Sequence, residues 1–236
     1  MSKTDAKALQ WIKKYTRYTD YIGAAQLYLK DNFLLKEPLE ADHFKARILG
    51  HWGTVPGLNF IYANLNYLIA KHKCEMLLIT GPGHGAPAIL ANLYAEKSLN
   101  AFYKGKYALD GEGMGEIIKD FSWPHTPFPS HVTPGVPGSI LEGGELGYSL
   151  STAFGSVMDN PDLITAVVVG DGEAETGPVA AAWHSNKWLN PKTSGAVLPI
   201  VHINGYKICN PTLFGTMDDK ELKSLFKGYG YEPLIV

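Results

Sequence analysis

An apolar run that ends in a glycine-rich acidic turn most constrains the fold of this chain. Residues 163–169 read Leu-Ile-Thr-Ala-Val-Val-Val, and residues 170–177 continue as Gly-Asp-Gly-Glu-Ala-Glu-Thr-Gly. The β-branched run predicts a buried strand, and the segment after the turn predicts a helix. Asp171 is therefore expected where a strand ends and a helix begins. The glycine on each side of it lets a bulky anion approach the backbone closely.

A second apolar run, residues 196–203, ends in Asn204-Gly205-Tyr206. The 33 positions between Asp171 and Asn204 (204 minus 171) have room for one helix, so the two strands can be parallel neighbours. One carboxylate, one side-chain amide and the backbone carbonyl of Tyr206 would then offer oxygen ligands suited to Mg²⁺ that also binds a diphosphate. Either turn alone is equally compatible with an ordinary tight turn. The pair predicts a site for a metal ion and a diphosphate.

Short apolar strands alternate with helical patterns along the chain, which predicts an α/β fold with a parallel sheet flanked by helices. In such sheets ligands bind at the carboxyl ends of the strands. Residues 123–138 contain five prolines and predict a long loop, because proline disrupts both helices and central strands. Further helices are predicted at 5–31, 58–71, 86–96, 143–158 and 218–227, and further strands at 75–80 and 229–236.

Composition excludes several classes of protein. The chain has 236 residues, of which 45% are hydrophobic and 19% charged, so widespread disorder is not expected. A net charge of -2 gives no electrostatic case for binding nucleic acid or an anionic membrane. No apolar run approaches the roughly 18 residues of a membrane span. With Cys74 and Cys209 as the two cysteines, a disulfide framework is not expected, and the sequence favours a cytoplasmic protein.

Three histidines lie in loops near glycine or proline: His51, His84 and His131. Each alone is compatible with a hydrogen-bonded surface histidine. Together they suit a site that moves protons near neutral pH, where imidazole is the natural side chain. The cysteines and histidines do not have the spacing of a zinc site.

A competing motif occurs at residues 81–86, which match the dinucleotide fingerprint G-x-G-x-x-A after a predicted strand. That fingerprint requires an acidic residue at the end of a second strand about 20 positions on. Residues 100–104 instead read Asn-Ala-Phe-Tyr-Lys. Nicotinamide binding is therefore disfavoured.

With these motifs in place, the chain resembles a thiamine-diphosphate enzyme, and more closely the phosphoketolase family that acts on xylulose 5-phosphate and fructose 6-phosphate. Transketolase shares the Gly-Asp-Gly turn and the later asparagine, but not the Glu-Ala-Glu-Thr-Gly-Pro extension at residues 173–178. One departure is Leu141, which stands where the family often has histidine. The resemblance rests on residues 50–54, 81–85, 130–131, 142–148, 170–178 and 202–211.

The resemblance implies roles for individual residues. It places Mg²⁺ on three of the oxygen donors already described, and thiamine diphosphate on glycine-rich segments next to them. It also implies that the three loop histidines line the reacting centre. The implied metal ligands are Asp171, Asn204 and the Tyr206 carbonyl, and the implied cofactor contacts are Gly144, Leu146, Asp171, Gly172, Glu173 and Asn204.

The implied activity is that of an aldehyde-lyase of carbohydrate metabolism. Such an enzyme cleaves a ketose phosphate with inorganic phosphate to acetyl phosphate and an aldose phosphate. Residues 1–236 are expected to form a single diphosphate-binding domain with a helical extension over about 1–45. A pyrimidine-binding domain or a second subunit, in a homodimer or larger assembly, would complete the site. Two alternatives stay open: transketolase-like ketol transfer, and a non-catalytic cofactor-binding fragment or subunit.

Overall fold

The computed structural model describes residues 3–236 and divides into two units, each made of two stretches of the chain. The first unit contains the residues up to 73 and residues 83–144, and the second contains residues 74–82 and 145–236. The expectation that all 236 residues act as one diphosphate-binding domain stays a prediction.

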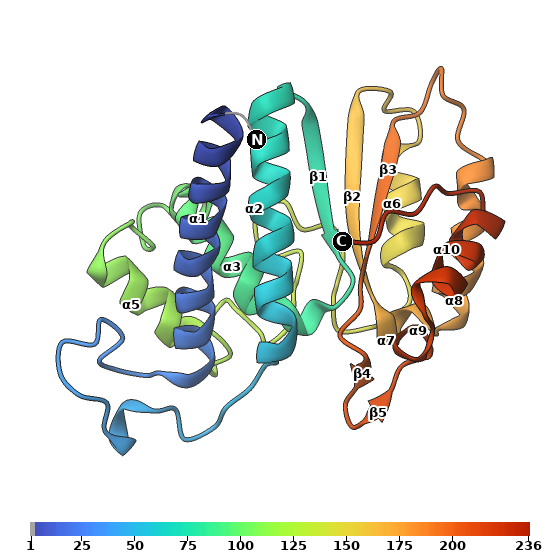
Figure 1. The fold of residues 1–236 in the computed structure, drawn as a ribbon. Coiled ribbons are helices and arrows are strands. Elements are labelled where there is room, and N and C mark those ends of the chain that lie inside the picture. Colours follow the sequence, from blue (N-terminus) through green and yellow to red (C-terminus); the bar gives the residue numbers. More distant parts are fainter. Residues whose placement is uncertain (1–2) are drawn as a thin grey trace. The chain divides into compact units, whose positions relative to one another are not determined.

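The first unit is built on three helices that pack against one another: α1 (Lys3–Tyr28), α2 (Val55–His72) and α3 (Ala86–Ala95) (Figure 1). All three were predicted from the helical spacing of apolar residues. The second helix begins three residues earlier than predicted, with Pro56 in its first turn, where the missing N–H is tolerated. The unit also contains the helices α4 (Ser98–Phe102) and α5 (Gly111–Asp120), and the 3₁₀ turns η1 (Ala41–His43), η2 (Trp52–Thr54) and η3 (Gly83–Gly85).

A buried lysine holds the chain between α1 and α2. The Nζ of Lys45 donates to the carbonyls of Gln26 (2.7 Å), Ile118 (2.9 Å) and Phe121 (3.1 Å). Its exposed fraction is 7%, and burial lowers the pKa of Lys45 to about 8. The side chain therefore connects the end of α1 to the end of α5, upstream of the loop that carries His51.

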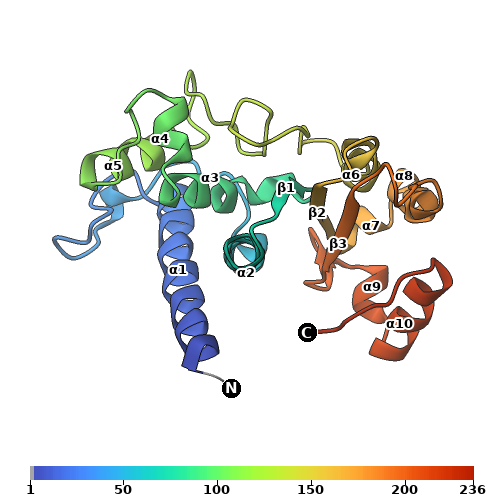
Figure 2. The same ribbon diagram turned by 90° about the horizontal axis from the view of Figure 1, so that it is seen from above.

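The second unit contains a parallel sheet with the strand order β1-β2-β3, formed by β1 (Glu75–Thr80), β2 (Leu163–Gly170) and β3 (Ala196–His202). The central strand is fully buried from Ala166 to Val169, as its β-branched run predicted. Helix α6 (Ser149–Val157) contacts all three strands and lies against one face of the sheet (Figure 2). The predicted parallel α/β fold is confirmed.

The remaining elements of this unit follow β2 and β3. An aromatic cluster packs Trp183 against Phe226, Tyr229 and Tyr231. These elements are the helices α7 (Asp171–Ala174), α8 (Gly177–Ala182), α9 (Leu213–Thr216) and α10 (Asp219–Gly228), the 3₁₀ helix η4 (Trp183–Lys187), and a short hairpin of β4 (Tyr206–Lys207) and β5 (Asn210–Pro211).

Two expectations for secondary structure are wrong. The helix expected to open at Gly143 begins at Ser149, because Gly147 has a φ of 115°, a left-handed conformation that interrupts a helix. The strand expected over 229–236 does not form: residues 231–236 have no regular structure, and none of the described strands pairs with them. An apolar run becomes a strand only where another strand supplies ladder hydrogen bonds. The predicted long loop at 123–138 is confirmed.

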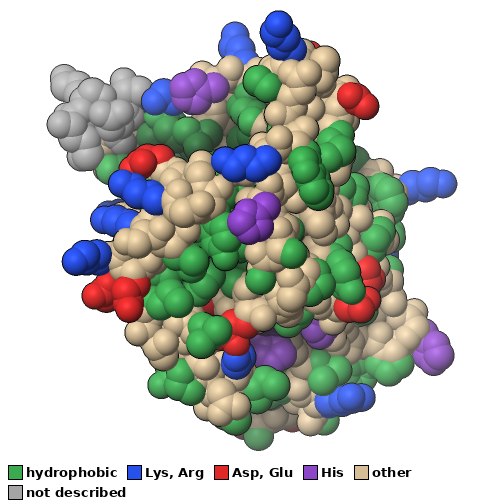
Figure 3. Space-filling view, turned by 90° about the vertical axis from the view of Figure 1, so that its right-hand side faces the viewer, with side chains coloured by type: hydrophobic (Ala, Val, Ile, Leu, Met, Phe, Trp, Pro, Cys, Tyr) green, Lys and Arg blue, Asp and Glu red, His purple; other side chains and the backbone are tan. Residues whose placement is uncertain are grey.

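No helix in the described part of the chain combines the length and the apolar character needed to cross a bilayer. The face drawn in Figure 3 carries basic and acidic side chains interspersed with hydrophobic ones. The cytoplasmic location stays a prediction.

We expect Lys45→Met to lower the free energy of unfolding by about 3 kcal/mol, because three buried carbonyls lose their donor. Urea denaturation of the 236-residue chain measures this. Lys30→Met, at an exposed position, is the control and should leave the unfolding midpoint unchanged. Equal midpoints for the two variants would contradict the role given to Lys45.

Candidate functional site

The ends of β2 and β3 bring two of the predicted ligand loops together. Gly170 pairs in register with His202, so Asp171 lies beside the segment that follows β3. Oδ2 of Asp171 accepts a hydrogen bond of 2.8 Å from the N–H of Gly205. The carboxylate therefore lies directly against the turn that contains Asn204.

The carboxylate of Asp171 is held in one orientation. Its exposed fraction is 3%. Oδ2 also accepts a hydrogen bond of 2.7 Å from the hydroxyl of Thr212, and Oδ1 accepts one of 3.1 Å from the N–H of Gly172. Three donors on two oxygens leave the group little freedom to rotate.

Asn204 and Tyr206 form the turn beside this carboxylate. Oδ1 of Asn204 accepts a hydrogen bond of 3.0 Å from the N–H of Tyr206, and Gly205 between them has a φ of 85°, which favours glycine. The side chain of Tyr206 is exposed, and the predicted ligand at this residue is its backbone carbonyl. Burial lowers the pKa of the neighbouring His202, an effect that Asp171 opposes, so this imidazole is neutral near pH 7.

The donor set fits the metal ion that the sequence implies. It contains a carboxylate, an amide and a backbone carbonyl, all oxygen ligands of the kind that Mg²⁺ prefers. Within residues 3–236 no group of three or more His, Cys, Asp or Glu side chains forms an alternative metal site. The assignment of Asp171, Asn204 and Tyr206 as ligands stays a prediction.

The carboxylate of Glu173 is directed into the protein. Its exposed fraction is 3%; Oε1 accepts hydrogen bonds from the hydroxyl of Ser149 (2.6 Å) and the N–H of Gly147 (3.3 Å), and Oε2 accepts one from the N–H of Gly170 (3.4 Å). Burial raises the pKa of Glu173, and the hydrogen bonds from Ser149 and Gly147 oppose this effect. A Cβ added at Gly81 would lie 1.9 Å from Oε2. The side chain thus connects the end of β2 to the start of α6.

Three other residues are predicted to contact the cofactor: Gly144, Leu146 and Gly172. Gly144 is exposed and donates its N–H to Oε1 of Glu142 at 3.2 Å, while the side chain of Leu146 is exposed. A Cβ at Gly172 would lie 3.1 Å from the Cβ of Lys207, so little room exists there for a larger residue. Contacts of Gly144, Leu146, Gly172 and Glu173 with a cofactor stay predictions.

The first unit brings the three predicted histidines together. The ring of His84 lies edge-on to that of His51, with centroids 4.7 Å apart, and 6.4 Å from that of His131. Oγ1 of Thr54 is 2.8 Å from Nε2 of His84, and Oγ of Ser130 is 2.9 Å from Nδ1 of His131. Both hydroxyls orient imidazole rings.

The position of His84 depends on a close approach of two backbones. Val132 donates its N–H to the carbonyl of Gly83 (2.9 Å) and accepts from the N–H of Gly143 (2.8 Å). A Cβ at Gly83 would lie 2.2 Å from the carbonyl oxygen of Gly143. Glycine at residue 83 therefore allows the loop that carries His131 to pack against the turn that carries His84.

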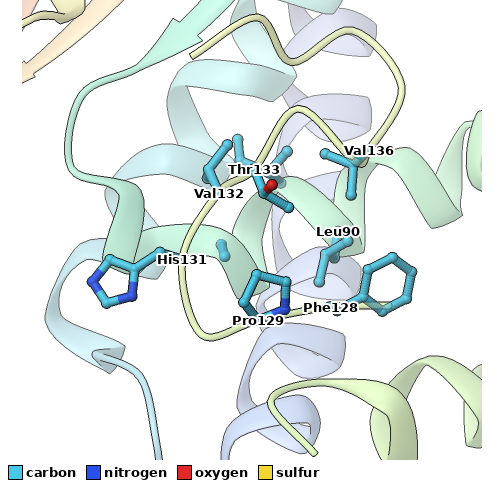
Figure 4. Close-up of a pocket in the computed structure, with 9 residues that line it drawn as sticks. Leu90, Phe128, Pro129, His131, Val132, Thr133 and Val136 are labelled. Carbon is cyan, nitrogen blue, oxygen red and sulfur yellow. The ribbon is translucent and has the colours of Figure 1, made fainter. Parts of the chain in front are cut away.

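Apolar side chains anchor the His131 loop. A cavity of about 10 Å³ behind it has room for about one water molecule, so no substrate fits there. Figure 4 shows Val132, Val136, Leu90 and Phe128 around this cavity, with the imidazole of His131 pointing away from them. The His131 loop therefore packs against apolar side chains on one side, and the imidazole of His131 lies on its other side.

The electrostatics of His131 favour a neutral ring. Burial lowers the pKa of His131, the nearby His51 lowers it further, and Glu142 opposes both effects. Because the pKa lies below its ordinary value, this imidazole is free to accept a proton near pH 7.

Sequence reasoning missed the residues that support these groups. Thr212 is the N-cap of the short helix α9, and its hydroxyl accepts a hydrogen bond from the N–H of Gly215. Threonine is a favoured N-cap residue, so this role has a signal in the sequence. Its hydrogen bond to Asp171, 41 positions away, has no such signal. No sequence signal marked Thr54, Ser130 and Ser149 as hydrogen-bond partners of these groups, because serine and threonine have many possible roles in loops, turns and helix starts.

We expect Gly81→Ala to destabilise the chain by about 3 kcal/mol or more, because its Cβ would overlap Oε2 of Glu173 and lie 2.7 Å from the carbonyl oxygen of Val168. Gly155→Ala, inside α6 with nothing within 4 Å, is the matched control and should raise stability by about 0.5–1 kcal/mol. Thermal denaturation of both variants measures the difference. Wild-type stability in Gly81→Ala would show that Glu173 does not lie where the structure places it.

We expect His51→Gln to raise the pKa of His131 but to leave it below the ordinary value, because burial is the larger cause of its shift. The pH dependence of the His131 ring signals in NMR spectra reports this value. His125→Asn is the control: the position is exposed and has a positive φ that asparagine tolerates. An unchanged pKa of His131 in His51→Gln would rule out electrostatic coupling of the two rings.

Comparisons with known proteins show the family to which the chain belongs. A family model described as "XFP N-terminal domain" matches residues 3–236. The chain is 58% identical over 228 residues to a "Probable phosphoketolase" of Nitrosospira multiformis and 55% identical over 228 residues to one of Bradyrhizobium diazoefficiens. Each match covers 97% of this chain and 28% of the relative, so the chain spans less than a third of their length.

Solved structures of transketolases share the fold. The transketolase of Campylobacter jejuni matches with a TM-score of 0.62 at 16% identity, over 95% of this chain and 32% of that chain. A transketolase of Pichia stipitis in complex with sedoheptulose 7-phosphate matches with a TM-score of 0.55 at 19% identity, over 98% of this chain and 31% of that chain. The resemblance to phosphoketolases drawn from the sequence is confirmed, and the chain belongs to the XFP N-terminal domain family.

Proposed function

We propose that this chain is the diphosphate-binding portion of a phosphoketolase that depends on thiamine diphosphate and Mg²⁺. The enzyme would cleave xylulose 5-phosphate, fructose 6-phosphate or both with inorganic phosphate, and release acetyl phosphate and an aldose phosphate. The observation that carries the proposal is the hydrogen bond from Gly205 to Asp171, which brings the turn of Asn204 and Tyr206 against the carboxylate. The names of the relatives support it.

Asp171, Asn204 and the carbonyl of Tyr206 would hold Mg²⁺. Gly144, Leu146, Gly172 and Glu173 would contact the cofactor alongside them. Bound thiamine diphosphate supplies the electron sink for cleavage of a carbon–carbon bond. The protein's part is to fix the oxygen donors before the cation arrives, which the three hydrogen bonds to Asp171 support.

His51, His84 and His131 would transfer protons to and from substrate oxygens. A neutral His131 is suited to accept a proton from a ketose hydroxyl. The hydroxyls of Thr54 and Ser130 would keep the rings of His84 and His131 in place. Loss of a hydroxyl group as water requires a proton donor, and a protonated imidazole of this cluster can serve.

The complete enzyme would need more than this chain. Because the match covers 28% of the relatives' length, we propose that their remaining domains, or a second subunit of a homodimer or larger assembly, complete the site. The family resemblance implies sugar phosphates and inorganic phosphate as the small-molecule partners. The composition and the net charge of -2 separately favour a cytoplasmic location and give no case for binding nucleic acid or a membrane.

Transketolase-like ketol transfer is the second candidate, favoured by the structural likeness to transketolases. The two activities differ in their products, because ketol transfer from xylulose 5-phosphate needs an aldose acceptor and makes no acetyl phosphate.

We expect a full-length enzyme that contains this chain to form acetyl phosphate from xylulose 5-phosphate, phosphate, thiamine diphosphate and Mg²⁺. Trapping the product as a hydroxamate measures the rate. Asp171→Ala and Asn204→Ala should each lower the rate by about 100-fold or more and weaken cofactor binding. Asp162→Ala, an exposed carboxylate just before β2, is the control and should retain wild-type activity.

Transketolase products without acetyl phosphate would favour the second candidate. Wild-type cofactor affinity in both Asp171→Ala and Asn204→Ala would exclude these residues as metal ligands.

A further inference from the structure

We propose that Thr212 and Glu175 are positioning residues for the cation site, an inference that rests on the proposed function. They hold the turn of Asn204 and Tyr206 against Asp171 from two sides. Neither residue is itself among the predicted ligands.

The hydrogen bonds to Asp171 distinguish its two oxygens. Oδ2 accepts from the N–H of Gly205 at 2.8 Å and from the hydroxyl of Thr212 at 2.7 Å. A carboxylate oxygen has about two lone-pair sites, so Oδ2 is saturated. Oδ1 accepts only from the N–H of Gly172 among the described residues, at 3.1 Å. Oδ1 is therefore the oxygen with a site left for a cation, and the bonds to Oδ2 keep it in place.

Thr212 contacts the turn through three groups. Its hydroxyl donates to Oδ2 of Asp171 and accepts from the N–H of Gly215 at 3.1 Å, and its own N–H donates to the carbonyl of Gly205 at 3.0 Å. The exposed fraction of the residue is 1%. A Cβ at Gly215 would lie 2.6 Å from Cα of Gly205, so the start of α9 packs directly on the turn. Thr212 thus fixes Gly205, and with it Asn204, relative to Asp171.

Glu175 holds the same loop at a second place. Its carboxylate accepts a hydrogen bond of 2.5 Å from the N–H of Leu213 and forms an ion pair with Lys207. Its side chain is 14% exposed, whereas the side chain of Lys207 is 44% exposed, so solvent partly screens this ion pair. Lys207 directly follows Tyr206, so the ion pair restrains the residue whose carbonyl is a predicted ligand. Asp171 and Glu175 are four positions apart and together hold both ends of the loop from Asn204 to Leu213.

Partners of metal ligands typically contribute 10- to 100-fold to metal affinity, because a ligand that rotates freely must be ordered by the ion. The same range is expected here for the loss of the Thr212 hydroxyl. Loss of the charge on Glu175 should have a smaller effect, because the hydrogen bond from Leu213 survives in a glutamine.

The test measures binding of thiamine diphosphate to the full-length protein by calorimetry over a series of Mg²⁺ concentrations. We expect Thr212→Val to require about tenfold more Mg²⁺ or higher for half-maximal binding, Thr212→Ser to stay within about threefold of wild type, and Glu175→Gln to fall between them. Thr216→Val is the matched control, because its exposed hydroxyl donates to Leu213 within α9 and does not reach Asp171. It should match wild type.

Hydrogen exchange in the cofactor-free protein gives a readout that does not depend on binding of thiamine diphosphate or Mg²⁺. The Gly205 amide should exchange faster in Thr212→Val and at the wild-type rate in Thr212→Ser and Thr216→Val. If Thr212→Val lowers the unfolding midpoint, the Mg²⁺ dependence of Glu175→Gln, compared with that of Thr212→Ser, tests the inference instead.

Wild-type Mg²⁺ dependence and Gly205 exchange in Thr212→Val, with Glu175→Gln also unchanged, would overturn the inference and leave the proposed function standing. A wild-type protein that binds no thiamine diphosphate at any Mg²⁺ concentration would overturn the proposed function, and this inference with it.

Discussion

The hydrogen bond between Asp171 and Gly205 is the interaction on which the candidate cation site of the second unit depends. It connects the residue after β2 to the turn after β3, two segments that the parallel register has already placed side by side. The sheet brings the two segments close together, and the hydrogen bond to the buried carboxylate fixes the orientation of the Gly205 turn. Neither alone would bring the turn of Asn204 and Tyr206 against Asp171, because turns after parallel strands can point in many directions.

The fold was largely predictable because its determinants are local. The runs at 75–80, 163–170 and 196–202 are rich in apolar and β-branched residues, and each forms the strand that this composition indicates. Where prediction failed, a longer-range factor decided. The positive φ of Gly147 delays the start of α6, and residues 231–236 have apolar composition but no strand to pair with.

The principal residues of the candidate site were predictable from the sequence, but the residues that hold them in place were not. Asp171, Asn204, His51 and His84 stand in glycine-containing turns, and His131 stands in a proline-rich loop, all of which the sequence displays. Thr212 reaches Asp171 across 41 positions, and Lys45 reaches Phe121 across 76, so only the folded chain reveals these contacts. Side chains that hold other side chains in place carry no local pattern, because any element that reaches them can supply the partner.

The proline-rich loop that carries His131 has a further consequence for ligand capture. Five prolines restrict its backbone torsions in the unfolded chain, and apolar side chains fasten it to α3 in the folded one. The loop therefore loses most of its conformational entropy when the chain folds, and little more when a ligand binds. A ligand that contacted this imidazole would therefore meet a preorganised surface, and its association there should carry a small entropic penalty.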